Sequence, residues 1–260
     1  MELIPLSNPF GGPVYYLRET SSTQDEARRL VAAGTPNGTV VLTDYQSAGR
    51  GRGQGRSWQA PPGENLLCTI ILQYQSLTDF PPAASIRVGL AVARAIEPYV
   101  SIPVYIKWPN DVILQDKKVC GILCEGAGTA LLIGIGLNIH QRDFPPGLAS
   151  RATSLALIQD MQTGTSSTPL ALDRNSILSR ILEELQQALS PDTSWQREVE
   201  RRLYKRGEIV SFVPGLPDTG PAIEGILEGV SPEGALVLRS FDGIPQSFVS
   251  GEIRFSSAPL

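Results

Sequence analysis

Closely spaced apolar runs between residues 65 and 139 limit the folds that this chain can adopt more than any other feature does. The run at 65–73, NLLCTIILQ, shows no polar alternation, which predicts a strand that is buried on both faces. Four more short apolar runs follow within the same stretch, with a hairpin turn expected at 115–117. These runs, which predict consecutive strands, lie at 104–108, 111–115, 118–126 and 130–139. We therefore expect a central sheet.

Segments with helical periodicity lie on both sides of these strands in the sequence. Residues 22–34 begin with a capping-box pair, Thr23 and Glu26, and end at Gly34. A second helix follows Pro82, and a third begins at Asp173, which can cap it. Shorter helices are expected near 154–160 and 194–204. The apolar faces predicted for the three longer helices are Ala27, Leu30 and Val31; Ile86, Leu90, Ala93 and Ile96; and Ile177, Ile181, Leu182, Leu185 and Leu189. The predicted class is α+β, a mixed sheet flanked by helices.

The composition changes after Tyr204. Short β segments with Gly/Pro turns occupy 207–213, 223–230, 234–240 and 246–255, a pattern that predicts a small SH3-like β-barrel. We therefore expect two domains, 1–204 and 205–260. Residues 1–16, which are rich in Pro and Gly, are expected to form a lead-in strand or arm.

Charge and composition exclude several function classes. The chain has 260 residues and a net charge of −4, which argues against a general binder of nucleic acids or membrane surfaces. Neither a signal peptide nor a membrane-length apolar run is present, so a cytoplasmic location is expected. Cys68, Cys120 and Cys124 fit no disulfide framework and are expected to be free thiols. Because the last two lie in apolar runs, a metal site that they form with His140 is not expected.

Residues 47–58, SAGRGRGQGRSW, place four glycines and three arginines in one segment without an acid. Glycine disfavours both helix and strand, so this is a loop whose arginines indicate an anionic partner. Three interpretations stay open at this point: a small phosphate ligand, single-stranded RNA, or a solvated surface loop. Neither the Walker pattern nor the dinucleotide-binding pattern fits the segment.

A second polar segment, KWPND at 107–111, lies between two predicted strands. Because Pro109 cannot donate to a strand ladder, residues 108–110 must leave the sheet. A cation, an amide and a carboxylate then share one tight connection, which could hold a phosphate, a ribose and a metal ion or amine together. The alternative is a turn in which Asn110 and Asp111 bond their own backbone.

These two segments together resemble the biotin–protein ligases. Further matches to that family are SSTQ (21–24), DYQSAGRGR (44–52), KKVCGIL (117–123), GIGLNI (134–139), ATSL (152–155) and GEIRF (251–255). The resemblance implies a class II synthetase-like catalytic domain at 1–204 and an SH3-like domain at 205–260. It also implies the monofunctional type, without an N-terminal winged-helix DNA-binding domain, because the matching sequence begins near Val14.

The resemblance implies a two-step reaction. Biotin and ATP, with Mg²⁺, form biotinyl-5′-adenylate, and biotin then passes to one lysine of the biotin carboxyl carrier protein of acetyl-CoA carboxylase. No DNA or membrane partner is expected, whereas pairing into a homodimer occurs in the family. The nearest alternative enzyme is a lipoate–protein ligase, which has an apolar acyl slot instead of hydroxyls that meet a ureido ring.

The resemblance also assigns roles to residues. It implies biotin contacts for Ser22, Thr23, Gln24, Gln46, Arg50, Gly51, Arg52 and Lys118. ATP or adenylate contacts are implied for Arg52, Arg56, Trp58, Asn110, Lys118 and Asn138, and catalytic roles for Lys118, Arg52, Asp111 and Lys107. Gln24 replaces the usual Asn of the family. Simpler roles are a helix cap for Ser22 and Thr23, a strand end for Gln46, a core aromatic for Trp58 and a solvated turn cation for Lys118.

Overall fold

The computed structural model describes residues 1–53, 55–161, 170–191, 194–215 and 220–254. Its larger sheet has the strand order β1-β2-β3-β4-β8-β7-β6-β5. Only β2 and β3 run parallel among the described pairs, so the sheet is mixed, as predicted. The strands are β1 (Glu2–Leu3), β2 (Val14–Thr20), β3 (Val40–Gln46), β4 (Leu66–Gln73), β5 (Tyr105–Lys107), β6 (Asp111–Leu114), β7 (Lys117–Ala127) and β8 (Ala130–Leu137).

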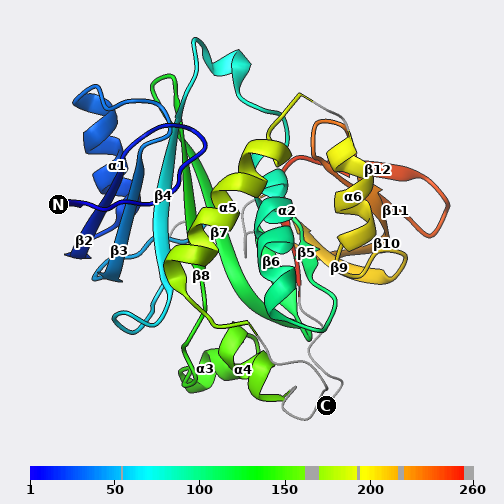
Figure 1. Ribbon diagram of the computed structural model, residues 1–260. Coiled ribbons are helices and arrows are strands. Elements are labelled where there is room, and N and C mark those ends of the chain that lie inside the picture. The colour runs from blue at the N-terminus through cyan, green and yellow to red at the C-terminus, as the bar shows by residue number, and fades with distance from the viewer. Residues whose placement is uncertain (54, 162–169, 192–193, 216–219, 255–260) are drawn as a thin grey trace.

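Helices cover both faces of this sheet because successive strand residues point to opposite sides. Figure 1 shows α2 (Ala84–Ile96) and α5 (Arg174–Ala188) side by side across one face. Alternate residues of the central strands pack toward them in the main core, among them Cys68, Ile70, Ile133 and Ile135. On the other face, α1 (Thr23–Ala32) packs through Ala27 against a smaller cluster that includes Val41, Ile71 and Leu132.

A second sheet follows in the C-terminal part of the chain, with the antiparallel order β12-β11-β10-β9-β13. Its strands are β9 (Ile209–Pro214), β10 (Ile223–Val230), β11 (Leu236–Arg239), β12 (Pro245–Phe248) and β13 (Gly251–Ile253). Five strands agree with the SH3-like expectation. The single segment expected at 246–255 is wrong, because the chain turns before Gly251 (φ 150°), so that β12 pairs with β11 and β13 with β9.

The remaining elements are short and lie around the two sheets. They are the 3₁₀ helices η1 (Leu77–Asp79) and η2 (Glu97–Tyr99) and the helices α3 (Pro146–Ala149), α4 (Leu155–Met161) and α6 (Ser194–Arg202). Asp173 caps α5 by accepting a hydrogen bond from the Ser176 N–H at 2.7 Å, as predicted. No helix in the described part of the chain combines the length and the apolar character that a membrane crossing requires.

The start of α1 differs from the expectation. The N-cap is Ser22, whose side chain makes no capping hydrogen bond. The Glu26 carboxylate accepts hydrogen bonds from Thr20 and Arg29 and does not reach back to the helix end, so the expected capping box is wrong. The hydroxyls of Ser22 and Thr23 are therefore not engaged in capping. The lead-in strand or arm expected at 1–16 contains β1 and the first three residues of β2, whereas the rest of β2, at 17–20, was not predicted.

Candidate active site

A cavity opens on the face of the larger sheet where α1 begins. Ten of the predicted site residues line it: Ser22, Thr23, Gln24, Gln46, Arg50, Gly51, Arg52, Trp58, Asn110 and Lys118. They come from the start of α1, the end of β3, the Gly/Arg loop, the KWPND turn and β7. Segments that are distant in sequence therefore meet at one place, as the resemblance implies.

The floor of the cavity is hollow because the strands carry glycine there. On β8, Ile133, Ile135 and Leu137 face the main core, so the alternation turns Gly134 and Gly136 toward the cavity. A Cβ atom on Gly134 would lie 2.7 Å from Nε2 of Gln24, and one on Gly136 would lie 2.6 Å from the Trp58 ring. These glycines are needed because Gln24 and Trp58 lie directly on the sheet.

One end of the cavity offers hydrogen-bonding atoms that the described protein leaves unpaired. The Gln24 side chain donates from Nε2 to the Leu123 carbonyl at 2.8 Å, which leaves its buried Oε1 without a partner among the described residues. The buried hydroxyl of Ser22 is unpaired in the same sense. Buried polar atoms are normally hydrogen-bonded, so these two indicate a polar ligand group at this end.

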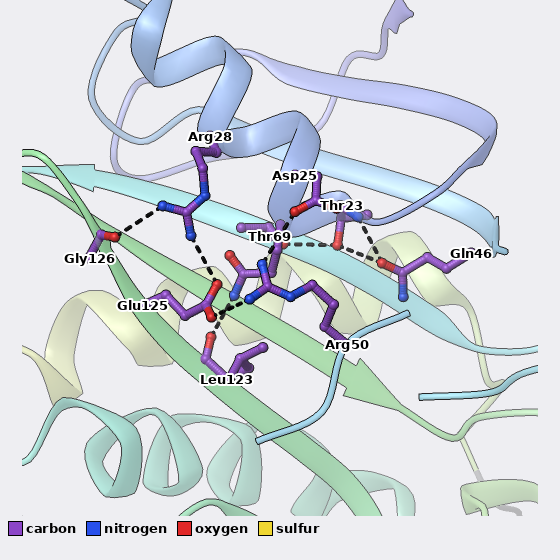
Figure 2. Close-up of polar contacts among 10 residues, drawn as sticks. Thr23, Asp25, Arg28, Gln46, Arg50, Thr69, Leu123, Glu125 and Gly126 are labelled. Atoms are coloured by element: carbon purple, nitrogen blue, oxygen red, sulfur yellow. Dashed lines mark hydrogen bonds and ion pairs between the residues drawn. The ribbon is translucent and has the colours of Figure 1, made fainter. Parts of the chain in front are cut away.

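The Gln46 amide is oriented by Thr23. Its Oε1 accepts from the Thr23 backbone N–H at 2.8 Å and from the Thr23 hydroxyl at 3.1 Å. The Thr23 hydroxyl in turn accepts from the hydroxyl of Thr69, a fully buried residue of β4, at 2.9 Å. Figure 2 shows this chain of contacts beside the start of α1. Gln46 therefore keeps its NH₂ group available as a donor.

Lys118 reaches the cavity because of an irregularity in β7. In a regular strand Lys118 would share a face with Cys120, which lies in the main core. The β6–β7 register slips between Val112 and Ile113, which places both Val119 and Cys120 in the core. Lys118 then lies on the Gly121 side, where its ammonium group is 2.6 Å from an oxygen of Asp111 and 5.5 Å from the centre of the Trp58 ring.

Charged side chains gather at the other end of the cavity. Lys107, Lys118, Arg52 and Arg56 interact electrostatically with Asp111 and Glu252, so this cluster holds four cations and two carboxylates. Burial lowers the pKa of Lys107 to about 8, while attraction by Asp111 and Glu252 opposes that shift. An excess of positive charge in a partly buried place favours an anionic ligand.

The Gly/Arg loop is attached to the protein on two sides. Figure 2 shows Arg50 between α1 and β7, where its guanidinium lies 3.3 Å from Asp25 and 2.7 Å from Glu125. Arg52 donates to the Gly251 carbonyl at 2.7 Å, and Arg56 pairs with Glu252 at 2.7 Å. All three arginines therefore contact protein acceptors, and the side chains of Arg50 and Arg56 are still 39% exposed.

Not every predicted residue lines the cavity. Asp111, Lys107 and Arg56 belong to the charged cluster at its edge. Asn138 is buried and donates to the Thr153 carbonyl at 3.0 Å, which attaches the 153–155 segment to the end of β8.

Sequence reasoning missed Thr69 and Glu252. Glu252 lies in the GEIRF motif, which was a usable signal, whereas a threonine inside an apolar strand gives none.

Two observations concern the residue types that bind metals or act as thiol nucleophiles. Across the described ranges, no group of three or more His, Cys, Asp or Glu side chains is arranged to hold a metal ion. The three cysteines are free, and burial raises the pKa values of Cys68 and Cys124 to about 12. Such thiols are protonated at neutral pH, so they are poor nucleophiles.

Residues 16–141 match the model of the biotin/lipoate A/B protein ligase family. Among curated proteins, the chain is 32% identical over 246 residues to a biotin–[acetyl-CoA-carboxylase] ligase of Paracoccus denitrificans, covering 86% of this chain and 92% of that one. It is 37% identical over 153 residues to the bifunctional ligase/repressor BirA of Bacillus spizizenii, covering 56% of this chain but only 47% of that protein.

A solved structure also resembles the chain over nearly its whole length. It is the biotin protein ligase from Aquifex aeolicus in complex with biotin and ATP, at 30% identity and a TM-score of 0.76. The match covers 94% of this chain and 99% of that one, so the two chains resemble each other over nearly their whole lengths.

Proposed function

This chain belongs to the biotin/lipoate A/B protein ligase family, and from that premise we propose that it is an ATP-dependent biotin–protein ligase. One observation carries the proposal: the cavity has unpaired hydrogen-bonding atoms at one end and an excess of cations at the other. Biotin has a neutral polar ureido ring at one end and a carboxylate at the other. The acceptor is a lysine of the biotin carboxyl carrier protein of acetyl-CoA carboxylase.

The polar end of the cavity fits a cyclic urea. A urea has two N–H donors and one carbonyl acceptor. Gln24 Oε1 and the Thr23 hydroxyl oxygen offer lone pairs to the donors, while Gln46 Nε2 and the Ser22 hydroxyl offer protons to the carbonyl. The substitution of Gln for the family Asn at position 24 is compatible with this role, because Leu123 holds the Gln24 amide in place.

The first step joins two anions. A carboxylate oxygen of biotin attacks the α-phosphorus of ATP, the bond to the β,γ-diphosphate breaks, and pyrophosphate leaves. Lys118 belongs to the charged cluster and also lines the cavity, so its ammonium group can contact both the carboxylate and the α-phosphate. Arg52 and Arg56 bind the phosphates, and Trp58 flanks the adenine. Fixed cations that meet the charge developing in the transition state lower the barrier.

The second step passes the acyl group to the lysine amine of the carrier. The amine attacks the acyl carbon, AMP leaves, and the proton of the amine must be accepted. Asp111, whose carboxylate lies 2.6 Å from the Lys118 ammonium group, orients the amine and accepts this proton. Because the adenylate is a reactive anhydride, water has to be excluded until the carrier docks. The Gly/Arg loop, attached at Arg50 and Arg52, covers the cavity for that purpose.

Mg²⁺ enters with ATP in this proposal. The carboxylates near the cavity already have cationic partners, Asp111 with Lys118, and Asp25 and Glu125 with Arg50. Phosphate oxygens and water are therefore the better ligands for the ion, as is usual for Mg²⁺ bound with a nucleotide. The ion would reduce the negative charge on the phosphates.

The test is incubation of the chain with ATP, Mg²⁺, biotin and a carboxyl carrier domain, followed by intact-mass measurement of the carrier. A mass gain of one biotinyl group on one lysine is expected. A parallel reaction with lipoate tests the other enzyme class of the family, and a lipoyl product without a biotinyl product would overturn the proposal. Biotin-dependent exchange between ATP and pyrophosphate tests the first step separately.

A further inference from the structure

Both main-chain groups of Lys118 are hydrogen-bonded to a segment that lies outside the strands of the larger sheet. The Lys118 N–H donates to the Arg151 carbonyl at 2.8 Å, and the Lys118 carbonyl accepts from the Thr153 N–H at 2.9 Å. Between these two residues, Ala152 forms an isolated parallel bridge with Lys118. We call residues 151–153 the bridge segment. It includes the start of the ATSL motif, to which the proposed reaction gives no role.

The bridge segment takes the place of β8 beside Lys118. On its other side Lys118 is opposite Ile113 of β6, whereas β8 ends at Leu137. The next carbonyl of β7, that of Val119, accepts from the Asn138 N–H at 2.9 Å. Two successive carbonyls of β7 therefore have partners on the same side, whereas in a regular strand they alternate. The bulge that directs the Lys118 side chain to the cavity is thus held on this side by two separate segments.

The side chain of Asn138 joins these two segments. Its NH₂ group donates to the Thr153 carbonyl at 3.0 Å, and its own main-chain carbonyl accepts from the Leu155 N–H at 3.2 Å. Asn138 and Thr153 are both buried, so a carbonyl that loses its donor here is not readily hydrated. Thr153 is therefore bonded to Lys118 through its N–H and to Asn138 through its carbonyl.

We propose that the bridge segment is a positioning element for Lys118 and that Asn138 holds this segment in place. The inference rests on the proposed function, in which the Lys118 ammonium group meets the biotin carboxylate and the α-phosphate. A shift of the main chain at Lys118 moves the ammonium group at the end of its long side chain, and misplacement of such a group lowers the rate steeply. Neither Asn138 nor the bridge segment lines the cavity, so the effect should appear in kcat and not in the KM for ATP.

The experiment replaces single main-chain N–H groups of the full chain with ester oxygens, by cell-free translation with the corresponding α-hydroxy acids. The ester at position 153 removes the donor to the Lys118 carbonyl and keeps the threonine side chain. The ester at position 156 is the matched control. There the Ala156 N–H donates to the Ile139 carbonyl at 2.9 Å, which joins the same part of the chain to the residues after β8 without touching Lys118.

Biotin-dependent exchange between ATP and pyrophosphate gives kcat and the KM for ATP. The ester at position 153 should lower kcat about 10-fold or more at a nearly unchanged KM, because a small displacement of a catalytic group can cost about 100-fold in rate. The ester at position 156 should leave both values near those of the wild type. Asn138→Ala, which removes the donor to the Thr153 carbonyl, is a second variant and should also lower kcat.

Amide hydrogen exchange measured by NMR provides a readout that does not depend on activity. The Lys118 N–H should exchange faster in the position-153 ester and in Asn138→Ala, but not in the position-156 ester. An equal loss of kcat in the two esters would overturn the inference, as would an unchanged exchange rate at Lys118. A raised KM for ATP at unchanged kcat would also overturn it and would favour the nucleotide contact of Asn138. Wild-type protein without biotin-dependent exchange would instead contradict the proposed function.

Discussion

The ammonium group of Lys118 lies 2.6 Å from an Asp111 oxygen, across the hairpin that joins β6 to β7. Lys107 pairs with Asp111 in the neighbouring ladder, so one carboxylate lies between two lysines. This pairing holds the Lys118 ammonium group, a member of the charged cluster, at the cavity.

Replacing Lys118 with Ala should stop adenylate formation. The approaching carboxylate and α-phosphate lose the cation between them, and the loss of such a group costs at least about 100-fold in rate. Biotin-dependent exchange between ATP and pyrophosphate measures this. Lys117→Ala is the matched control, because Lys117 is the adjacent lysine and donates to the Ala149 carbonyl, away from the cluster. Full exchange activity in Lys118→Ala would remove Lys118 from the mechanism.

Replacing Arg52 with Gly should leave adenylate formation measurable but release the adenylate early. Arg52 attaches the Gly/Arg loop to the Gly251 carbonyl at 2.7 Å, and the variant loses that attachment together with a cation that we propose binds phosphate. Biotinylation of unrelated lysines, quantified by mass spectrometry on a bystander protein, should rise about 10-fold or more as the loop no longer retains the intermediate. Arg239→Gly, which removes an arginine that pairs with Glu228, is the control. Retention of the adenylate equal to the wild type would refute the covering role.

Much of the fold could be predicted because its strands and helices carry strong local patterns. The run at 65–73 became β4, which is buried on both faces, and the apolar positions of α2 and α5 lie in the core. β2 was missed because its burial is incomplete and its sequence, VYYLRET, mixes apolar and charged residues. The split between β12 and β13 was missed because the partner of β13 is β9, which lies far away in sequence.

The candidate site was predictable only where a motif carries it. Composition and spacing gave a loop and a turn with open alternatives, and the resemblance connected them to Ser22, Gln46 and Lys118. The bulge that turns Lys118 to the cavity depends on pairing with β6, which no local pattern encodes. Asn138 is a different case: its motif is present and its amide donates to the Thr153 carbonyl, and its contact with the nucleotide stays a prediction.

Replacing Gly136 with Ala should impair nucleotide binding. The added Cβ would lie 2.6 Å from the Trp58 ring, so the ring must move away from the sheet and leave the position in which we propose that it flanks the adenine. An increase in the KM for ATP of about 10-fold is expected, the scale of the free energy of a lost aromatic contact. Gly126→Ala is the matched control, because its Cβ would meet nothing closer than 3.8 Å. An unchanged KM would show that nucleotide binding does not require the Trp58 ring to lie on Gly136.

Lys107 should make the stability of the protein depend on alkaline pH in an unusual direction. Burial lowers its pKa to about 8, whereas the unfolded chain holds the proton up to the ordinary value of 10.5. Between these values the unfolded state binds more protons, so the Lys107 contribution to the free energy of unfolding increases as the pH rises. The increase is roughly 1–3 kcal/mol and is complete near the ordinary value.

The measurement is urea unfolding of the wild type and Lys107→Met at intervals from pH 7 to pH 10. Other titrating groups are shared, so they cancel in the difference between the two proteins, and the mutation removes only the Lys107 contribution. Below pH 8 the wild type carries a charge that burial penalises. The free energy of unfolding of the wild type, relative to that of Lys107→Met, should therefore be lowest there. As the pH rises above 8, the free energy of unfolding of the wild type should increase relative to that of Lys107→Met. Lys107→Gln, which also lacks the charge, should give the same slope. A difference that stays flat across this range would mean that Lys107 keeps its proton in the folded protein, and that Asp111 and Glu252 outweigh the effect of burial.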